Sequence, residues 1–206
     1  AKLHIAASDQ HIQQLLAFLK LLVKWNPVYN LTAIRDVSQM VSHHLLDGLA
    51  VLPYLGEGPV LDVGAGAGLP GIPLAIMRPD QEFTLLDSNA KKTRFMRQAV
   101  IDLGLRNVNV VQQRVEALPT KKKYATVISR AFASLADMLT LAGHLCRPSG
   151  AILAMKGEYP TAELQALPAG FTLQAVIPLE IPGLEAQRHL VHIVPTKSPS
   201  GPVVGI

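Results

Sequence analysis

One stretch of this chain constrains its fold more than any other. The run Val60–Val63 is apolar apart from Asp62. Four closely spaced glycines follow it: Gly64, Gly66, Gly68 and Gly71. A second apolar run, Phe83–Leu86, ends in Asp87. This pattern predicts a strand, a glycine turn, a helix and a second strand, which ends in an acid about 20 residues further on. Such an arrangement is typical of a Rossmann-like unit that binds an adenosine-containing cofactor.

The chemistry of the turn separates two cofactors. Gly66–Gly71 also fits the dinucleotide pattern G-x-G-x-x-G, but a pyrophosphate needs free N–H groups at the helix start and no anion nearby. Asp62 would repel phosphates, and Pro70 and Pro73 remove two amide donors. S-adenosylmethionine (SAM) carries an ammonium and a sulfonium but no phosphate, so the turn favours SAM over NAD. A NAD-dependent reductase would also need a catalytic pair such as Tyr-x-x-x-Lys, which the sequence lacks.

Composition limits the remaining possibilities. The 206 residues, 49% of them hydrophobic, suffice for one well-buried core, and we expect a single domain. No run approaches the roughly 18 apolar residues of a membrane span, and we expect a cytoplasmic protein. The single cysteine, Cys146, lies in an apolar stretch and is expected to be buried rather than nucleophilic. The net charge of +4 suits a polyanionic partner, although such an excess also occurs in proteins that bind no nucleic acid.

Hydrophobic periodicity predicts helices first and an alternating fold afterwards. Apolar spacing predicts helices over 10–25 and 38–49, an N-terminal helical cap within residues 1–55 that is part of the same domain. Apolar runs then alternate with helical patterns near 70–77, 89–103 and 134–146, which predicts a parallel sheet in a Rossmann-like core over 56–206. The runs are Val60–Val63, Phe83–Leu86, Val108–Val111, Ala125–Ile128 and Ile152–Met155. Two final runs, 171–177 and 190–194, are joined without a helix, which predicts an antiparallel ending.

Several motifs together resemble one family. They are Trp25–Asp36, His44–Asp47, Asp62–Pro73, Leu86–Ser88, Lys92–Phe95, Arg114–Glu116, Ser129–Ala133, Met155–Gly157 and Arg188–Leu190. In this order, over nearly the whole chain, they resemble the bacterial 16S ribosomal RNA (rRNA) guanine-N7 methyltransferases, also called glucose-inhibited division protein B. The resemblance implies an α/β fold, the class I SAM-dependent methyltransferase, with a mostly parallel sheet, an antiparallel C-terminal strand and an N-terminal helical extension.

The resemblance also implies roles at the cofactor. Gly64 and Leu69 would line the methionine end, Asp87 would bind the ribose hydroxyls, and Val115 with Glu116 would flank the adenine. The full set of expected cofactor-binding residues is Asp62, Gly64, Gly66, Gly68, Leu69, Asp87, Val115, Glu116 and Arg130. Two alternatives stay open from the residues alone: Asp87 as a helix-capping or solvated acid, and Glu116 as a carboxylate near a helix N-terminus.

The implied reaction needs no general base. It transfers the methyl group of SAM to N7 of a guanine, by resemblance guanine 527 of 16S rRNA. N7 has a free lone pair on the major-groove edge, so the enzyme only has to position the nucleophile and the methyl group. We assign Arg130 and Lys156, which end predicted strands, to grip O6, a phosphate or the cofactor, because a cation on N7 would oppose the transfer. The alternative for both is a surface cation at the sheet edge.

The RNA contacts are assigned to clustered cations. The candidates are Arg35, Lys91, Lys92, Arg94, Lys122 and Arg188. RNA of this kind is recognised largely through shape and phosphate, although most charge runs are simply solvated faces. The expected partner of a monomeric enzyme is 16S rRNA or the small ribosomal subunit. No metal is expected, because the adjacent His43 and His44 would point apart on a helix. Two alternatives remain: a small-molecule SAM-dependent methyltransferase, and a SAM- or RNA-binding regulator without methyl transfer.

Overall fold

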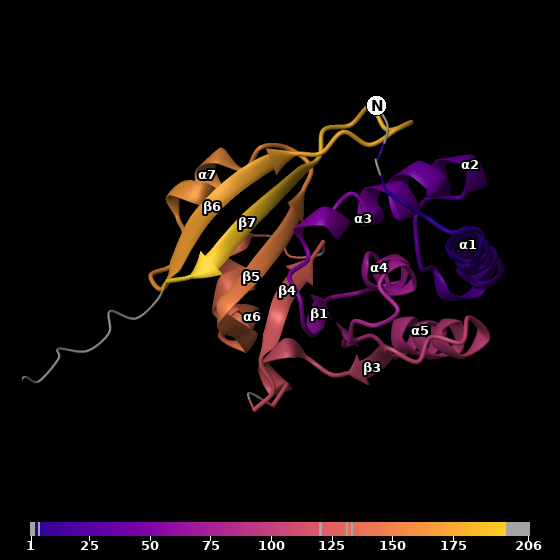
Figure 1. The fold of residues 1–206 in the computed structure, drawn as a ribbon, viewed down its shortest axis with the longest axis horizontal. Helices are drawn as coiled ribbons and strands as arrows, with labels where there is room; N and C mark the ends of the chain where they lie inside the picture. The colour runs from indigo at the N-terminus through magenta and orange to yellow at the C-terminus, as the bar shows by residue number, and fades with distance from the viewer. Residues whose placement is uncertain (1–2, 4, 120, 131, 133, 197–206) are drawn as a thin grey trace, which may run out of the picture.

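A computed structural model describes residues 3, 5–119, 121–130, 132 and 134–196. Within them a seven-stranded sheet runs in the order β3-β2-β1-β4-β5-β7-β6 (Figure 1). The strands are β1 Val60–Val63, β2 Phe83–Asp87, β3 Val108–Gln112, β4 Tyr124–Ser129, β5 Cys146–Lys156, β6 Phe171–Pro178 and β7 His189–Pro195. Strands β3, β2, β1, β4 and β5 are parallel, and β7 is antiparallel to both β5 and β6. The predicted parallel sheet with an antiparallel ending is confirmed.

Helices precede the sheet and connect its strands. They are α1 Asp9–Tyr29, α2 Val37–Met40, a π-helical segment Val41–Leu46, α3 Asp47–Leu49, α4 Gly71–Met77, α5 Ala90–Asp102, α6 Leu135–Ala142 and α7 Thr161–Gln165. Short 3₁₀ turns cover Leu52–Tyr54, Val115–Ala117 and Gly143–Leu145. In the described part of the chain, no helix combines the length and apolar character needed to cross a membrane.

The first helix is longer than predicted because both of its ends are specified locally. Ser8 Oγ accepts from the His11 N–H at 3.2 Å, and the Ser8 N–H donates to His11 Nδ1 at 3.4 Å, so the helix begins at Asp9. It continues through Pro27 to Tyr29 and ends where Asn30 adopts a left-handed φ of 49°. Its buried apolar side chains are Leu15, Phe18, Leu19 and Leu22. Their spacing places one face of α1 against the core.

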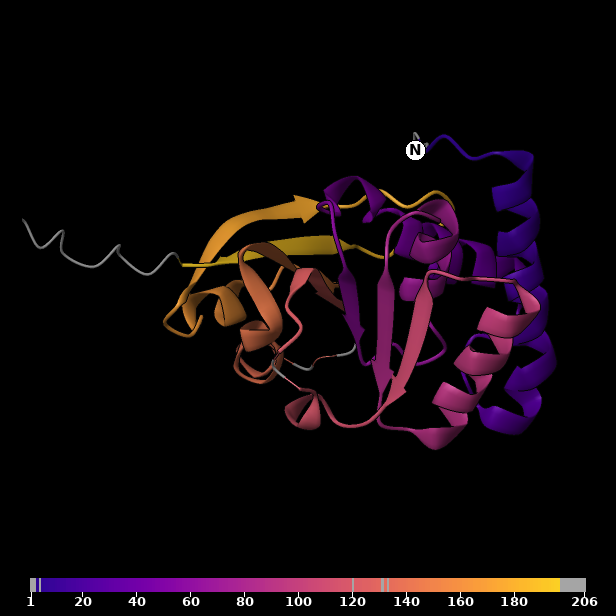
Figure 2. The ribbon, with the colours of Figure 1, turned by 60° about the horizontal axis from the view of Figure 1, so that its bottom comes forward.

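The sheet is covered on both faces. Val60, Phe83 and Leu85 pack with α1, α4 and α5 on one face. Leu61 and Val63 point the other way and pack with α6. In Figure 2, α1 lies outside α5 at the edge of the molecule. Side chains of α1 enter the same core cluster as those of α4 and α5, so this packing supports a helical cap that belongs to the same domain. The division at residue 55 remains a prediction.

Two elements differ from the periodicity. The predicted helix over 134–146 ends at Ala142, and Cys146 already begins β5, which is longer than the predicted run Ile152–Met155. Between β3 and β4, the described residues form a 3₁₀ turn at Val115–Ala117 and no longer helix. Cys146 is buried as predicted, and burial raises the pKa of its thiol to about 12, so it is not a ready nucleophile at neutral pH.

Candidate functional site

The glycine turn and Asp87 meet at the C-terminal ends of β1 and β2. Gly66 has a φ of 59°, and its N–H donates to Asp87 Oδ2 at 2.8 Å. Asp87 Oδ1 accepts from the Asn89 N–H at 2.8 Å, just before α5 begins. Asp87 therefore orders the start of α5 and also faces a cavity. Each carboxylate oxygen keeps a further lone pair for ligand hydroxyls.

The start of α4 is closed to a phosphate. The Gly71 N–H donates to Asp62 Oδ2 at 2.9 Å, and the Ile72 N–H donates to the Gly68 carbonyl at 2.8 Å. Pro70 and Pro73 carry no N–H. Every residue of this turn is described, and residues 70–73 leave no backbone donor for a pyrophosphate. A phosphate-free cofactor such as SAM fits this helix start, and a dinucleotide does not.

Asp62 supports the turn from beneath it. Its side chain is 0% exposed and lines none of the cavities described below, so direct contact with a cofactor does not fit this placement. Burial raises the pKa of Asp62 to about 7, and the Gly71 hydrogen bond and the Arg130 charge offset this only in part. A carboxyl that titrates near neutrality repels phosphates weakly. The closed helix start, rather than the charge of Asp62, therefore disfavours the dinucleotide.

Gly68 also supports the turn and does not line a cavity described here. Its φ is 77°, and a Cβ at this position would lie 2.4 Å from Ile72 Cδ1. Ile72 is fully buried, so it cannot move aside without displacing its neighbours. The turn therefore packs closely on α4 at Gly68, and the expected cofactor contact of Gly68 stays a prediction.

Three cavities adjoin one another along this edge of the sheet. The Asp87 cavity, about 290 Å³, is lined by Val63, Gly64, Leu86, Asp87, Ser88, Lys92, Gln113, Arg114, Val115, Glu116, Phe132 and Leu141. The glycine-loop cavity, about 180 Å³, is lined by Leu31, Thr32, His44, Gly64, Ala65, Gly66, Ala67, Leu69, Lys92 and Arg130. The Arg188 cavity, about 360 Å³, is lined by Ile34, His43, His44, Asp47, Arg130, Met155, Lys156, Gly157 and Arg188.

Shared residues join the cavities into a row. Gly64 and Lys92 line the first two, and His44 and Arg130 line the second and third. The row brings together most of the predicted cofactor residues, namely Gly64, Gly66, Leu69, Asp87, Val115, Glu116 and Arg130. Sequence reasoning missed Gln113, whose Nε2 is buried without a hydrogen-bond partner among the described residues. Its place directly after β3, next to the Arg114–Glu116 motif, was the available signal.

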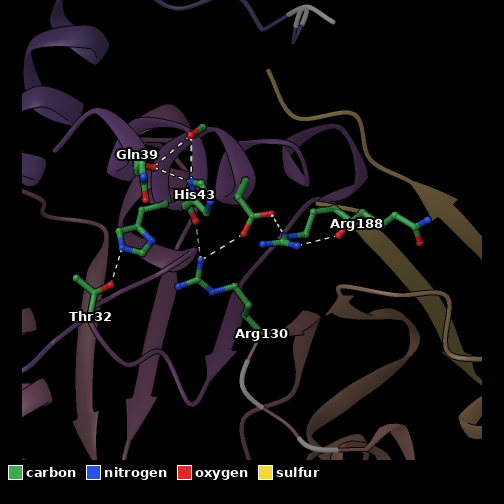
Figure 3. Close-up of polar contacts among 9 residues, drawn as sticks. Thr32, Gln39, His43, Arg130 and Arg188 are labelled. Atoms are coloured by element: carbon green, nitrogen blue, oxygen red, sulfur yellow. Dashed lines mark hydrogen bonds and ion pairs between the residues drawn. The ribbon is translucent and has the colours of Figure 1, made fainter. Parts of the chain in front are cut away.

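A buried carboxylate joins two arginines from distant parts of the chain. Asp47, 2% exposed, accepts from Arg130 Nη1 at 3.3 Å on Oδ2 and from Arg188 Nε at 3.1 Å on Oδ1. Figure 3 labels both arginines, and the dashed lines include these two ion pairs. Arg130 follows β4, and Arg188 precedes β7. Asp47 therefore ties the N-terminal helices to the segment after β4 and to the segment before β7, which lie at the same edge of the sheet.

The π-helical segment explains how Arg130 is held. In an α-helix the Asp47 N–H would donate to the His43 carbonyl, but here it donates to the carbonyls of Ser42 and His44. The His43 carbonyl instead accepts from Arg130 Nη1 at 3.3 Å (Figure 3). One wide helical turn thus supplies both a carbonyl and, through Asp47, a carboxylate to the same guanidinium group.

His44 lies where the second and third cavities meet. It is 5% exposed, and its Nε2 is 2.8 Å from Thr32 Oγ1. Burial, aided by the Arg130 charge, lowers the pKa of His44 to about 4, so the imidazole is neutral at physiological pH. Within the described ranges, no group of three or more His, Cys, Asp or Glu side chains could hold a metal ion.

Lys156 is tied to the start of α6. Its Nζ lies 2.9 Å from Glu163 Oε2, and its side chain is 13% exposed. The same Glu163 oxygen accepts from the Leu135 N–H at 2.6 Å. Lys156 lines the Arg188 cavity, as its predicted position at the end of β5 implied. It is an ordered, paired cation rather than a loose surface one.

The cations predicted to bind RNA occupy different surroundings. Arg35, Lys91 and Arg94 are exposed, and the last two lie on α5. Lys92 instead lines two of the cavities, and Arg188 is paired with Asp47. Lys122 precedes β4 at the opposite edge of the sheet, where its Nζ is 3.1 Å from Glu82 Oε2. These six residues therefore do not form one patch.

Solved structures identify the fold. A SAM-dependent methyltransferase from Aquifex aeolicus aligns over 77% of this chain and 94% of its own, with a TM-score of 0.57 and 18% identity. The glycopeptide N-methyltransferase MtfA complexed with SAM aligns over 74% and 87%, with a TM-score of 0.57 and 18% identity. The fold is that of the class I SAM-dependent methyltransferases. The start of α4, which has no free N–H for a phosphate, agrees with SAM as the cofactor.

Sequence relatives identify the family. The model of the family described as rRNA small subunit methyltransferase G matches residues 11–191. Proteins named ribosomal RNA small subunit methyltransferase G are 52% identical in Nitrosococcus oceani, over 95% of this chain and 92% of theirs, and 50% identical in Chromobacterium violaceum, over 94% and 93%. The chain belongs to this family.

Proposed function

We propose that this protein transfers the methyl group of SAM to N7 of a guanine in 16S rRNA. The row of three adjoining cavities carries the proposal, because it joins two cavities lined by the expected cofactor-binding residues to a basic cavity. The named relatives support ribosomal RNA as the substrate. By resemblance the target is guanine 527. The enzyme would be monomeric and cytoplasmic, and its substrate would be the small ribosomal subunit or its RNA.

The first two cavities suit the parts of SAM. Asp87 would accept hydrogen bonds from the ribose diol, and Val115 and Glu116 would flank the adenine. Gln113 Nε2, buried and unpartnered among the described residues, would donate to an adenine nitrogen. Lys92, which lines both cavities, would pair with the methionine carboxylate.

The chain needs to position the reactants and does not need to move a proton. The N7 lone pair forms a bond to the methyl carbon while the carbon–sulfur bond breaks, and its electron pair stays on sulfur. The positive charge passes from sulfur to the purine. Arg130 and Lys156 would contact the acceptor nucleotide at atoms other than N7, because a cation on N7 would oppose the positive charge that develops there. Neutral His44 adds no charge beside the sulfonium.

Methyl transfer from labelled SAM tests the proposal. We expect label in small-subunit RNA from cells lacking this protein, mapped as N7-methylguanine at one site. Asp87→Ala should weaken SAM binding by about 10-fold or more, because it removes a charged acceptor from the cavity. The matched control is Asp80→Ala, an exposed acid beside the opposite edge of the sheet.

The remaining alternatives predict different results. SAM binding with transfer only to small molecules would replace the RNA substrate, and SAM binding without any transfer would indicate a regulator. Label at an RNA position other than guanine N7 would contradict the proposed reaction while keeping the class of enzyme.

A further inference from the structure

We propose that the Arg188 cavity receives the target base after it has left the RNA stack, and that its donors select a purine with an oxygen, not an amino group, at C6. This inference rests on the proposed function and adds where the acceptor base lies and which groups recognise it. Its first support is position. A methyl acceptor must adjoin the methyl donor, and His44 and Arg130 line both this cavity and the glycine-loop cavity.

The second support is the charge of the cavity walls. Arg130, Lys156 and Arg188 all line it, and Asp47 is the one acidic side chain among the described lining residues. Both Asp47 oxygens already accept from the two arginines. The walls therefore present mainly N–H donors, fixed in place by Asp47 and by the Glu163 partner of Lys156.

Donors of this kind distinguish the two purines. Guanine carries the acceptor O6 beside N7, whereas adenine carries an N6 amino donor there. A cation facing O6 gains a hydrogen bond, and the same cation facing an amino group leaves two donors opposed. Because N7 must stay free to attack the methyl group, O6 is the acceptor left for a cation on that edge.

The third support is space for an aromatic ring. Ile34 and Met155 provide apolar wall, and Gly157 leaves an opening. A Cβ placed on Gly157 has one neighbour within 4 Å, Arg188 Nη1 at 4.0 Å, and the backbone there is not left-handed. A larger side chain at residue 157 would thus be accepted by the backbone and would project toward Arg188. A base must be unstacked to reach such a cavity.

Base analogues test the recognition. Small-subunit RNA would carry guanine, inosine or 2,6-diaminopurine at the mapped target. Inosine keeps O6 and loses only the 2-amino group, so we expect its transfer rate to stay within about 5-fold of guanine. 2,6-Diaminopurine replaces O6 with an amino group, and we expect a loss of about 10- to 100-fold. Equal rates for guanine and 2,6-diaminopurine would overturn the proposed selection.

Cavity-filling variants test the location. Gly157→Leu should keep SAM affinity within about 2-fold and lose methyl transfer by about 100-fold or more, because the leucine takes the place of the base. The matched control is Gly56→Leu, whose Cβ would meet only Thr126 Oγ1 at 3.8 Å, before β1 at the opposite edge. Arg188→Ala, which removes a partly exposed side chain, should raise the KM for RNA by about 10-fold without changing SAM affinity.

The outcomes separate this inference from the proposed function. Wild-type transfer to RNA together with unchanged transfer by both Gly157→Leu and Arg188→Ala would overturn the inference alone. Absence of wild-type transfer to any RNA would overturn the proposed function and the inference with it.

Discussion

Two buried ionisable side chains of the site respond to burial in opposite directions. The pKa of Asp62 rises from 3.8 to about 7, so the stability that its protonated form contributes is complete below about pH 4 and is lost as pH rises through 7. The pKa of His44 falls from 6.5 to about 4, so its contribution is complete above pH 6.5 and is lost as pH falls through 4. Between pH 4 and 7 the two side chains therefore give opposing slopes.

Asp62→Asn separates these slopes. Asparagine can still accept the Gly71 N–H but does not titrate. We expect the free energy of unfolding of the variant, relative to wild type, to increase by a few kcal/mol, to order of magnitude, as pH rises from 4 to 7. Urea unfolding at several pH values measures this, with exposed Asp80→Asn as the control. A difference between variant and wild type that is constant with pH would contradict the buried titration.

At the residue scale, the sequence indicated where the cofactor turn lies but not the direction of each side chain. All four residues of β1 are buried, so no apolar–polar alternation shows which face Asp62 occupies. Of the glycines in the pattern, Gly64 and Gly66 line a cavity, whereas Gly68 packs on Ile72. Such roles depend on the path of the turn in three dimensions.

At the element scale, helix α5 carries two adjacent lysines with different surroundings. Lys91 is exposed, whereas Lys92 lines the Asp87 and glycine-loop cavities. We expect Lys92→Glu to weaken SAM binding by about 10-fold or more, because a favourable charge near the methionine carboxylate becomes a repulsive one. Lys91→Glu should leave SAM affinity within about 2-fold and weaken RNA binding. Calorimetry with SAM and filter binding with RNA measure the pair, and equal SAM affinities would refute the placement of Lys92.

The elements themselves were largely predictable, and the exceptions have local causes. Apolar or alternating runs bounded by turns predicted all seven strands, although β5 is longer than its run. The helix over 38–49 was predicted as regular, but residues 41–46 are π-helical. Nothing in its apolar spacing distinguishes a π turn from an α turn, because the difference is one shifted hydrogen bond stabilised by contact with Arg130.

At the scale of the whole molecule, the site depends on contacts that sequence spacing does not reveal. Asp47 lies 83 residues from Arg130 and 141 residues from Arg188, yet it contacts both. The motifs that contain these residues were found separately, and only the fold brings them to one cavity. Parallel strands place their C-terminal ends on one edge, which is why Arg130 and Lys156 could be assigned to that edge.

The same geometry divides the predicted RNA-binding cations between two edges. Lys122 lies before β4, and a six-residue strand of about 3.3 Å per residue separates it from the cofactor edge by about 20 Å. Lys122 is paired with Glu82, and both side chains are more than half exposed, so the pair adds little stability. We therefore expect Lys122→Ala to leave RNA binding unchanged, in contrast to the sequence-based assignment.

The salt dependence of RNA binding tests this division of the molecule. The logarithm of RNA affinity falls with the logarithm of salt concentration, and each lost phosphate contact makes this slope less steep by about 1. Arg94 is exposed on α5 near the cofactor edge, and we expect Arg94→Ala to make the slope less steep by about 1. Lys122→Ala should keep the wild-type slope. Both variants remove one exposed cation, so net charge alone predicts equal effects. A lower slope for Lys122→Ala would extend the RNA footprint to the opposite edge of the sheet.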